Sequence, residues 1–158
     1  MASEHTEGIL AARDRTRQLH VGKVPVGGGA PVSVQSMCTT KTDDPSSTLS
    51  QIARLAEEGC EIIRIAVPNA AVLDGFGEIC RLSPLPVVAD IHFDHRLAIE
   101  AAQRGAAALR VNPGNIGSFK RVDAVIDAAG EANIPIRIGV NAGSLDRKVD
   151  ARQDLTLP

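Results

Sequence analysis

The sequence predicts an α/β fold with a parallel sheet, and it favours the first part of a TIM-like (β/α)8 barrel. Short apolar segments alternate about five times with amphipathic segments of helical length, which is the pattern of parallel βα units. Polar side chains recur toward the carboxyl ends of four successive strands, whereas a five-stranded doubly wound sheet would gather its ligand at one switch point. A complete barrel typically needs about 250 residues. The 158 residues of this chain therefore predict an incomplete barrel of about five βα units with an N-terminal hairpin.

The elements are expected in the following order. Residues 1–17 are polar and are predicted to be flexible, and residues 18–158 form the barrel portion. The segment LHVGKVPVGGGAP (19–31) contains two short alternating runs broken by glycine and proline, which predicts a hairpin. No sixth strand is expected after residue 141. Strands are predicted at 30–37, 61–67, 86–91, 107–111 and 135–140, and helices at 48–58, 69–82, 94–104 and 118–132, with Gly59 and Gly105 closing two helices.

Composition argues against several classes of protein. A formal net charge of −2 provides no basic field for nucleic acid. Trp and Tyr are absent and there are three Phe, so the stacking platform of a single-strand binder is missing. No apolar run approaches the length of a membrane span. The N-terminus lacks the apolar core of a signal peptide, and its acidic residues argue against a transit peptide, so a cytoplasmic (bacterial) protein is expected.

The cysteines and lysines point away from three further kinds of site. Cys38, Cys60 and Cys80 are widely spaced without a CxxC pair, which indicates neither a disulfide framework nor a zinc site. They fall after the first strand, at the start of the second strand and on a helix, so they are expected to stay apart and to be buried as small apolar groups. The lysines all fall outside the strand ends, which argues against a Schiff-base aldolase.

Three arginines lie inside apolar strands and form the main candidate site. Because side chains in a strand alternate between its two faces, Arg64 shares a face with a small alanine, Arg110 with Asn112, and Arg137 with Asn141. A lone buried guanidinium is costly, so these groups must be paired or solvated. Their planar forks suit phosphate oxygens, and the Gly- and Asn-rich loops after the last two strands would add backbone N–H donors. Ile63, Ile65, Val111 and Ile138 are expected on the opposite face.

Asp90 and His92 share the same predicted face and leave several roles open. They could serve as an acid/base pair, orient a hydroxylated substrate, bind a metal, or form a structural contact. The simpler alternative for the arginines is that one or two of them merely pair with Asp90 or Glu61. Gln35 has the matching position on the first strand. Its side chain could contact a substrate, or it could be a buried polar group that bonds to the backbone. His95 begins the next helix and is expected to be solvated.

Five segments carry a resemblance to a known family. They read VPVGGGAPVSVQSM, RIAVP, VADIHFDHRLA, LRVNPGNIG and IPIRIGVNAGSL, and they resemble 4-hydroxy-3-methylbut-2-enyl diphosphate synthase from about residue 15 to 147. The resemblance implies a TIM-like barrel followed by a separate C-terminal domain that carries a [4Fe–4S] cluster. It implies a homodimer that opens the ring of 2-C-methyl-D-erythritol 2,4-cyclodiphosphate in isoprenoid biosynthesis, with two electrons from flavodoxin or ferredoxin.

The resemblance also implies roles for individual residues. The three arginines would hold the diphosphate, Asn112 and Asn141 would add hydrogen bonds, and Asp90 and His92 would line the erythritol portion. Cys38 stands where the family commonly has Thr, and a histidine replaces a common Tyr at position 95. The cluster ligands belong to the second domain, which is expected to be absent here, so the chain alone is expected to be inactive. The alternatives are a pterin-binding barrel like dihydropteroate synthase and a non-catalytic anion-binding fragment.

Overall fold

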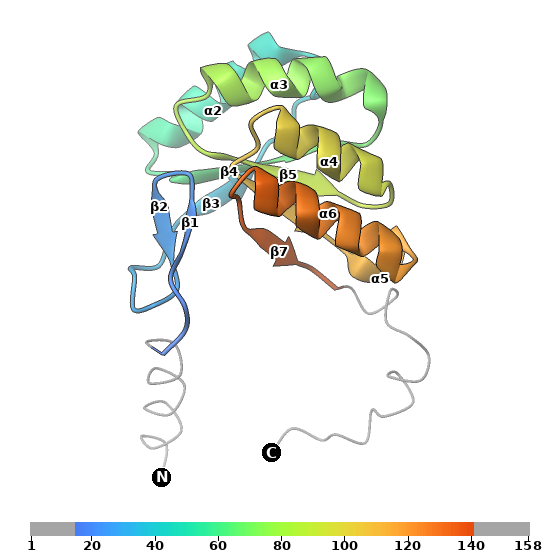
Figure 1. Ribbon diagram of the computed structural model, residues 1–158. Coiled ribbons are helices and arrows are strands. Elements are labelled where there is room, and N and C mark those ends of the chain that lie inside the picture. The colour runs from blue at the N-terminus through green and yellow to red at the C-terminus, as the bar shows by residue number, and fades with distance from the viewer. Residues whose placement is uncertain (1–14, 141–158) are drawn as a thin grey trace, which may run out of the picture.

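A computed structural model of the protein describes residues 15–140 (Figure 1). An antiparallel hairpin precedes a five-stranded parallel sheet whose strands are ordered β3-β4-β5-β6-β7. The strands are β1 (Leu19–Val21), β2 (Val24–Val26), β3 (Gln35–Met37), β4 (Ile62–Ala66), β5 (Val87–Ile91), β6 (Ala108–Val111) and β7 (Ile136–Ile138). The helices are α2 (Pro45–Glu57), the 3₁₀ turn η1 (Ala70–Val72), α3 (Leu73–Leu82), α4 (His95–Gln103), α5 (Pro113–Ile116) and α6 (Phe119–Glu131).

The winding of the chain is that of a barrel. Each strand lies next to its predecessor in sequence, and all neighbours in the main sheet are parallel. The connecting helices α2, α3, α4 and α6 all lie on one face of this sheet (Figure 1). A doubly wound domain would place helices on both faces. The predicted fold class, an incomplete TIM-like barrel with a hairpin before it, is therefore confirmed.

The outer face of the sheet and the helices enclose the main core. On the strands, Ile63, Ile65 and Leu109 are at most 1% exposed, as their alternation with the polar residues predicts. From the helices, Ile52 of α2 and Phe76 of α3 are fully buried against them. Each such side chain contributes roughly 1.5–3 kcal/mol when it leaves water. This layer fixes the strands whose other face carries the candidate site.

The hairpin closes the amino-terminal end of the inner face. Its residues Val21 and Val24 are buried against three inner-face side chains, Ile62, Val88 and Ala108. We call these three residues the apolar layer. The predicted hairpin is thus confirmed, and its packing explains why the inner face is apolar at the end where the strands begin.

The edge strands are shorter than predicted. The segment 30–37 was expected to be one strand, but only Gln35–Met37 pairs with β4. Val32 and Val34 before it are 76% and 54% exposed, so they have no apolar surface to pack on. Ile138 at the other edge has the predicted orientation but is 68% exposed, because none of the described residues covers that edge.

Helix boundaries follow local capping that hydrophobic periodicity does not reveal. Helix α2 begins at Pro45, earlier than predicted, because the Asp44 side chain accepts a hydrogen bond from the Ser47 N–H and proline suits the first turn. Gly59 and Gly105 follow α2 and α4 with φ of +89° and +94°, which confirms their predicted places. The predicted helix 69–82 divides into η1 and α3, and the short helix α5 was not predicted.

Between residues 15 and 140, no helix combines the length and the apolar character that crossing a membrane requires. The predicted flexible segment 1–17 lies almost entirely outside the described residues, as do Asn141 and the chain beyond it.

Candidate functional site

The register of the parallel strands aligns three polar residues of the inner face across neighbouring strands. Asp90 on β5 is directly opposite Arg110 on β6, and Arg110 is opposite Arg137 on β7. Arg64 lies on β4, opposite Val88, which is two residues before Asp90. Asp90 and Arg110 stand toward the carboxyl ends of their strands, where barrels build their active sites, and Arg64 and Arg137 stand at the middle of theirs. We call these four residues the polar layer.

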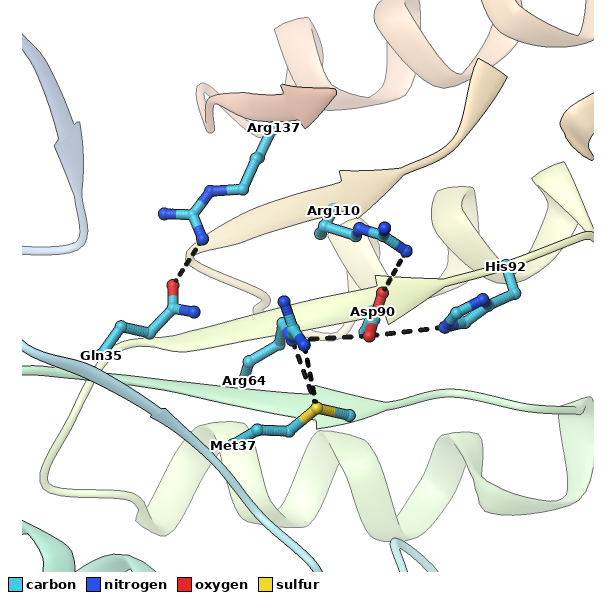
Figure 2. A network of polar contacts seen from close by, with 7 residues as sticks. All are labelled: Gln35, Met37, Arg64, Asp90, His92, Arg110 and Arg137. Atoms are coloured by element: carbon cyan, nitrogen blue, oxygen red, sulfur yellow. Dashed lines mark hydrogen bonds and ion pairs between the residues drawn. The ribbon is translucent and has the colours of Figure 1, made fainter. Parts of the chain in front are cut away.

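Asp90 is the centre of the layer. Its side chain is 3% exposed and is surrounded by three basic groups (Figure 2). The Arg110 Nη1 donates to Asp90 Oδ1 at 3.2 Å, the Arg64 Nε lies 3.4 Å from Oδ2, and the His92 Nε2 lies 3.5 Å from Oδ2. A buried carboxylate is costly without such partners. Asp90 therefore holds two guanidinium groups and one imidazole on the inner face.

The guanidinium groups differ in their surroundings. The Arg110 side chain is 11% exposed and that of Arg64 is 29% exposed. Arg64 also donates from Nε and Nη2 to the Met37 sulfur, at 3.3 and 3.1 Å. Arg137 is exposed, and its Nη1 donates to Gln35 Oε1 at 2.9 Å (Figure 2). That last contact joins the two edge strands across the inner face, so the sheet is strongly curved.

The simpler alternative, in which one or two arginines pair with Asp90 or Glu61, describes Arg64 and Arg110, which both pair with Asp90. Glu61 Oε2 accepts from the Val34 N–H and fixes the approach to β3. Arg110 and Arg137 are neighbours of like charge on adjacent strands, an arrangement that is destabilising without an anion between them. The layer thus carries three guanidinium groups, and those of Arg64 and Arg110 contact its one buried carboxylate.

Asn112 has a structural contact that the sequence analysis did not predict. It is fully buried, and its Oδ1 accepts from the Gly114 N–H at 3.1 Å, which caps α5. Pro113 occupies the first position of that helix, where a missing N–H costs nothing. The predicted role of Asn112 in binding stays a prediction, and that of Asn141 lies outside the described residues.

A pocket of about 200 Å³ adjoins the polar layer at the ends of β4 and β5. Asp90 and His92 line it together with apolar groups that include Val67, Phe93 and Leu97. The His92 side chain is 46% exposed, so it contacts both solvent and Asp90. The pocket offers an apolar wall beside the Asp90–His92 contact, next to the guanidinium groups.

His95 differs from its expectation. Its side chain is 24% exposed and its Nδ1 lies 3.6 Å from Asp94 Oδ1, so it is partly buried beside a carboxylate. Sequence reasoning also missed the Met37 sulfur as an acceptor and the closeness of Gly139 to Arg110. The alternation that places Gln35 on the inner face places Met37 there too, and the position of Arg137 puts Gly139 on the same face.

The cysteines do not fit a metal or cluster site. Burial, with a smaller contribution from Cys60, raises the pKa of the Cys38 thiol to about 11, and burial raises the pKa of Cys80 to about 12. Metal ligands are thiolates, which such values disfavour. Cys38 and Cys60 are both buried in the main core, as predicted for small apolar groups. Among residues 15–140, no three His, Cys, Asp or Glu side chains are grouped to hold a metal ion.

The fold and this layer define a class of protein: a barrel of the TIM type with arginine side chains gathered on the inner face of its sheet. The family model described as the GcpE TIM-barrel domain matches residues 16–158, and the chain belongs to this family. A Mycobacterium bovis protein named 4-hydroxy-3-methylbut-2-en-1-yl diphosphate synthase (flavodoxin) is 60% identical over 140 residues, covering 88% of this chain and 36% of the relative. A Geobacter sulfurreducens protein of the same name is 56% identical over 135 residues, covering 85% and 38%.

Solved structures support the fold alone. The dihydropteroate synthase of Yersinia pestis matches with a TM-score of 0.60 at 14% identity, covering 87% of this chain and 53% of the synthase. A phospho-2-dehydro-3-deoxyheptonate aldolase of Thermotoga maritima matches with a TM-score of 0.57 at 16% identity, covering 81% and 39%. The pterin-binding alternative therefore rests on shared architecture, whereas the sequence relatives carry the diphosphate synthase name. The chain spans under two-fifths of those relatives' length.

Proposed function

We propose that this chain forms the substrate-binding barrel part of a 4-hydroxy-3-methylbut-2-en-1-yl diphosphate synthase. The substrate would be 2-C-methyl-D-erythritol 2,4-cyclodiphosphate, and the reaction its reductive ring opening. One observation carries the proposal: Arg64, Arg110 and Arg137 share the inner face of the sheet with a single buried carboxylate, Asp90.

The charges of the layer match a cyclic diphosphate. Three guanidinium groups and one carboxylate leave two positive charges, and each of the two bridged phosphates of the ring carries one negative charge. Arg64 and Arg110 already have fixed positions through Asp90, so little reorganisation is needed when the anion binds. Arg137 is exposed at the rim and would exchange its contact with Gln35 for a phosphate oxygen.

The remaining residues would act on the carbon skeleton. The pocket beside Asp90 and His92 would take the methylerythritol portion against Phe93 and Leu97. His92 would deliver or accept a proton there, with the Asp90 carboxylate orienting its imidazole. We propose Asn112 and Asn141 as additional hydrogen-bond partners of the diphosphate.

The reaction also requires two electrons. A [4Fe–4S] cluster, as the family resemblance implies, would supply them, with ligands outside residues 15–140. The relatives are named with flavodoxin, so we propose flavodoxin as the donor in preference to ferredoxin. A homodimer remains part of this proposal.

A chimera tests the proposal. Residues 16–158 of this chain replace the matching segment of the Mycobacterium bovis relative, and conversion of the cyclodiphosphate is measured with a chemical reductant. We expect turnover in the parent chimera and its loss when Arg64 and Arg110 are both changed to Ala, because the anion then loses its two preorganised contacts. Arg96→Ala, at a 77% exposed position on α4, is the matched control and should leave turnover unchanged. A folded, cluster-loaded parent chimera that does not bind the cyclodiphosphate would show the proposal to be wrong.

A second substitution in the chimera separates binding from chemistry. Asp90→Asn removes the only negative charge of the layer, so the affinity for an anion should be kept. Turnover should fall at least 10-fold, because His92 loses the carboxylate that orients its imidazole. Equal effects on binding and turnover would assign Asp90 to the anion site alone.

A further inference from the structure

Gly139 lies directly after β7, on the inner-face side of the sheet. Its N–H donates to the Val111 carbonyl at 2.9 Å, so it continues the ladder between β6 and β7. It is not among the glycines with positive φ. The backbone conformation at this position therefore suits any residue, and the reason for a glycine must lie in its surroundings.

The space that a side chain would need at Gly139 is filled by the guanidinium group of Arg110. A Cβ atom there would lie 2.5 Å from Nε, 2.7 Å from Nη2 and 2.9 Å from Cζ of Arg110, and these are its three nearest atoms. Real Cβ atoms essentially never come within 3.0 Å of another heavy atom. At Gly75, by contrast, the nearest atom is a backbone carbonyl, which makes that glycine a packing requirement. Gly139 is crowded only by a residue of the candidate site.

The Arg110 side chain is held between two strands. On one side its Nη1 donates to Asp90 Oδ1 on β5 at 3.2 Å, and on the other its Nε and Nη2 lie over Gly139. With 11% of the side chain exposed, little free space remains on the other sides. A methyl group at 139 would push the guanidinium away from β7, and its reach to Asp90 would change.

We infer that Gly139 is a positioning residue for Arg110: its missing side chain lets the guanidinium lie flat against β7 while it binds Asp90. Any side chain at this position would displace Arg110 and weaken the anion site. The effect on anion affinity rests on the proposed function, whereas the effect on the position of Arg110 does not.

A double-mutant cycle tests this inference by calorimetry with 2-C-methyl-D-erythritol 2,4-cyclodiphosphate on the full chain. Gly139→Ala should weaken binding about 10-fold, as expected when one charge-assisted contact is disturbed. In the Arg110→Ala background, the same change should alter affinity less than about twofold, because the crowded group is gone. Gly130→Ala is the matched control, since a Cβ there meets nothing within 4 Å. Equal effects of Gly139→Ala in both backgrounds would overturn the inference.

A ligand-free measurement keeps this test separate from the proposed function. In the parent chain, the Arg110 Nε–H resonance should be distinct and protected from exchange with water, and Gly139→Ala should shift it and speed its exchange. If Arg110→Ala binds the cyclodiphosphate as tightly as the parent, the proposed role of Arg110 in anion binding is wrong. The Nε–H resonance then decides by itself whether Gly139 positions Arg110. An unchanged resonance in Gly139→Ala means that Arg110 has not moved and the inference is wrong.

The same variants also test whether Gly139→Ala affects folding. Should Gly139→Ala unfold the chain, the double variant with Arg110→Ala should restore a cooperative thermal transition, because only the guanidinium opposes the new methyl group. If the double variant is unfolded as well, the cost has another source, and Gly139 is a structural residue.

Discussion

The inner face of the sheet presents two different surfaces that are two residues apart along each strand. At the amino-terminal end, the apolar layer of Ile62, Val88 and Ala108 packs under the hairpin. Two residues further along, the same strands place Arg64, Asp90 and Arg110 on a face that none of the helices between residues 15 and 140 covers (Figure 1). Both layers lie on the same strands and point to the same face. They differ in their side chains and in the element that covers them: apolar side chains pack under the hairpin, and charged side chains stay accessible.

This comparison predicts that damage to the two layers separates stability from binding. Ile62→Ala should lower the free energy of unfolding by about 2–5 kcal/mol, because Ile62 is 1% exposed and its removal leaves a cavity under the hairpin. The folded fraction should bind the cyclodiphosphate as the parent does. Urea unfolding measures the first quantity and calorimetry the second. Val32→Ala, at a 76% exposed position, is the control and should change stability by less than about 0.5 kcal/mol.

Loss of affinity in Ile62→Ala at full folding would show that the two layers are not independent. A parent-like stability would show that the hairpin does not pack on the sheet. Either result would contradict the interpretation that the apolar layer stabilises the fold without taking part in binding.

Much of this arrangement could be predicted from sequence because it depends on local alternation. The period of two assigned Ile63 to the core and Arg64 to the inner face, and the spread of polar residues over four strands favoured a barrel. The contact of Gln35 with Arg137 could not be predicted, since it depends on the curvature of the whole sheet between residues 102 apart. The crowding at Gly139 could not be predicted for a related reason, since it depends on the path of the Arg110 side chain from the neighbouring strand.

One further miss has a local cause. The helix α5 is too short for a hydrophobic period, and it exists because Asn112 caps it. Ile138 has the direction that its alternation predicts and is still 68% exposed, because alternation gives the direction of a side chain and not what covers it. Sequence patterns thus indicate faces well, and they indicate neighbours poorly where the neighbours come from distant strands.

The polar layer should respond in the opposite way to the apolar one. Arg64→Ala, Arg110→Ala and Arg137→Ala should each weaken cyclodiphosphate binding roughly 10- to 150-fold, since a charge-assisted contact contributes about 1.5–3 kcal/mol. Arg→Lys should restore only part of the affinity, because an ammonium group cannot form the bidentate fork. Arg137→Ala should have the least effect on stability, because Arg137 is exposed. Calorimetry on each variant, with Arg96→Ala as the surface control, measures the change.

Parent-like affinity in all three Arg→Ala variants would make these arginines structural partners of Asp90 and nothing more. A loss confined to Arg64 and Arg110 would instead limit the anion site to the two side chains that Asp90 holds. That result would place Arg137 and Gln35 at a rim contact outside the site.

The smallest expected effect belongs to a carboxylate with the same kind of partner as Asp90 but an exposed position. Asp94 caps α4 by accepting from the Arg96 N–H, and its side chain also pairs with the Arg96 guanidinium at 2.7 Å. These hydrogen bonds lower the pKa of Asp94 to about 2. Because the folded-state pKa lies below the ordinary value, the stabilisation is complete above about pH 4 and is lost as the pH falls toward 2.

Exposure limits the size of that effect. An exposed ion pair of this kind contributes about 0.2–1 kcal/mol, so Asp94→Asn should cost at most that at pH 7, and its unfolding curve should approach that of the parent near pH 2. Chemical unfolding at pH 7 and pH 2.5 measures the difference.

Asp90→Ala should lower the free energy of unfolding at pH 7 by at least twice as much as the Asp94 change. Asp94 contacts solvent and Asp90 does not, so removing Asp90 leaves two guanidinium groups without a buried partner. Equal costs at the two positions would mean that the polar layer is as solvated as the helix surface, and the distinction between the layers would then rest on the hairpin alone.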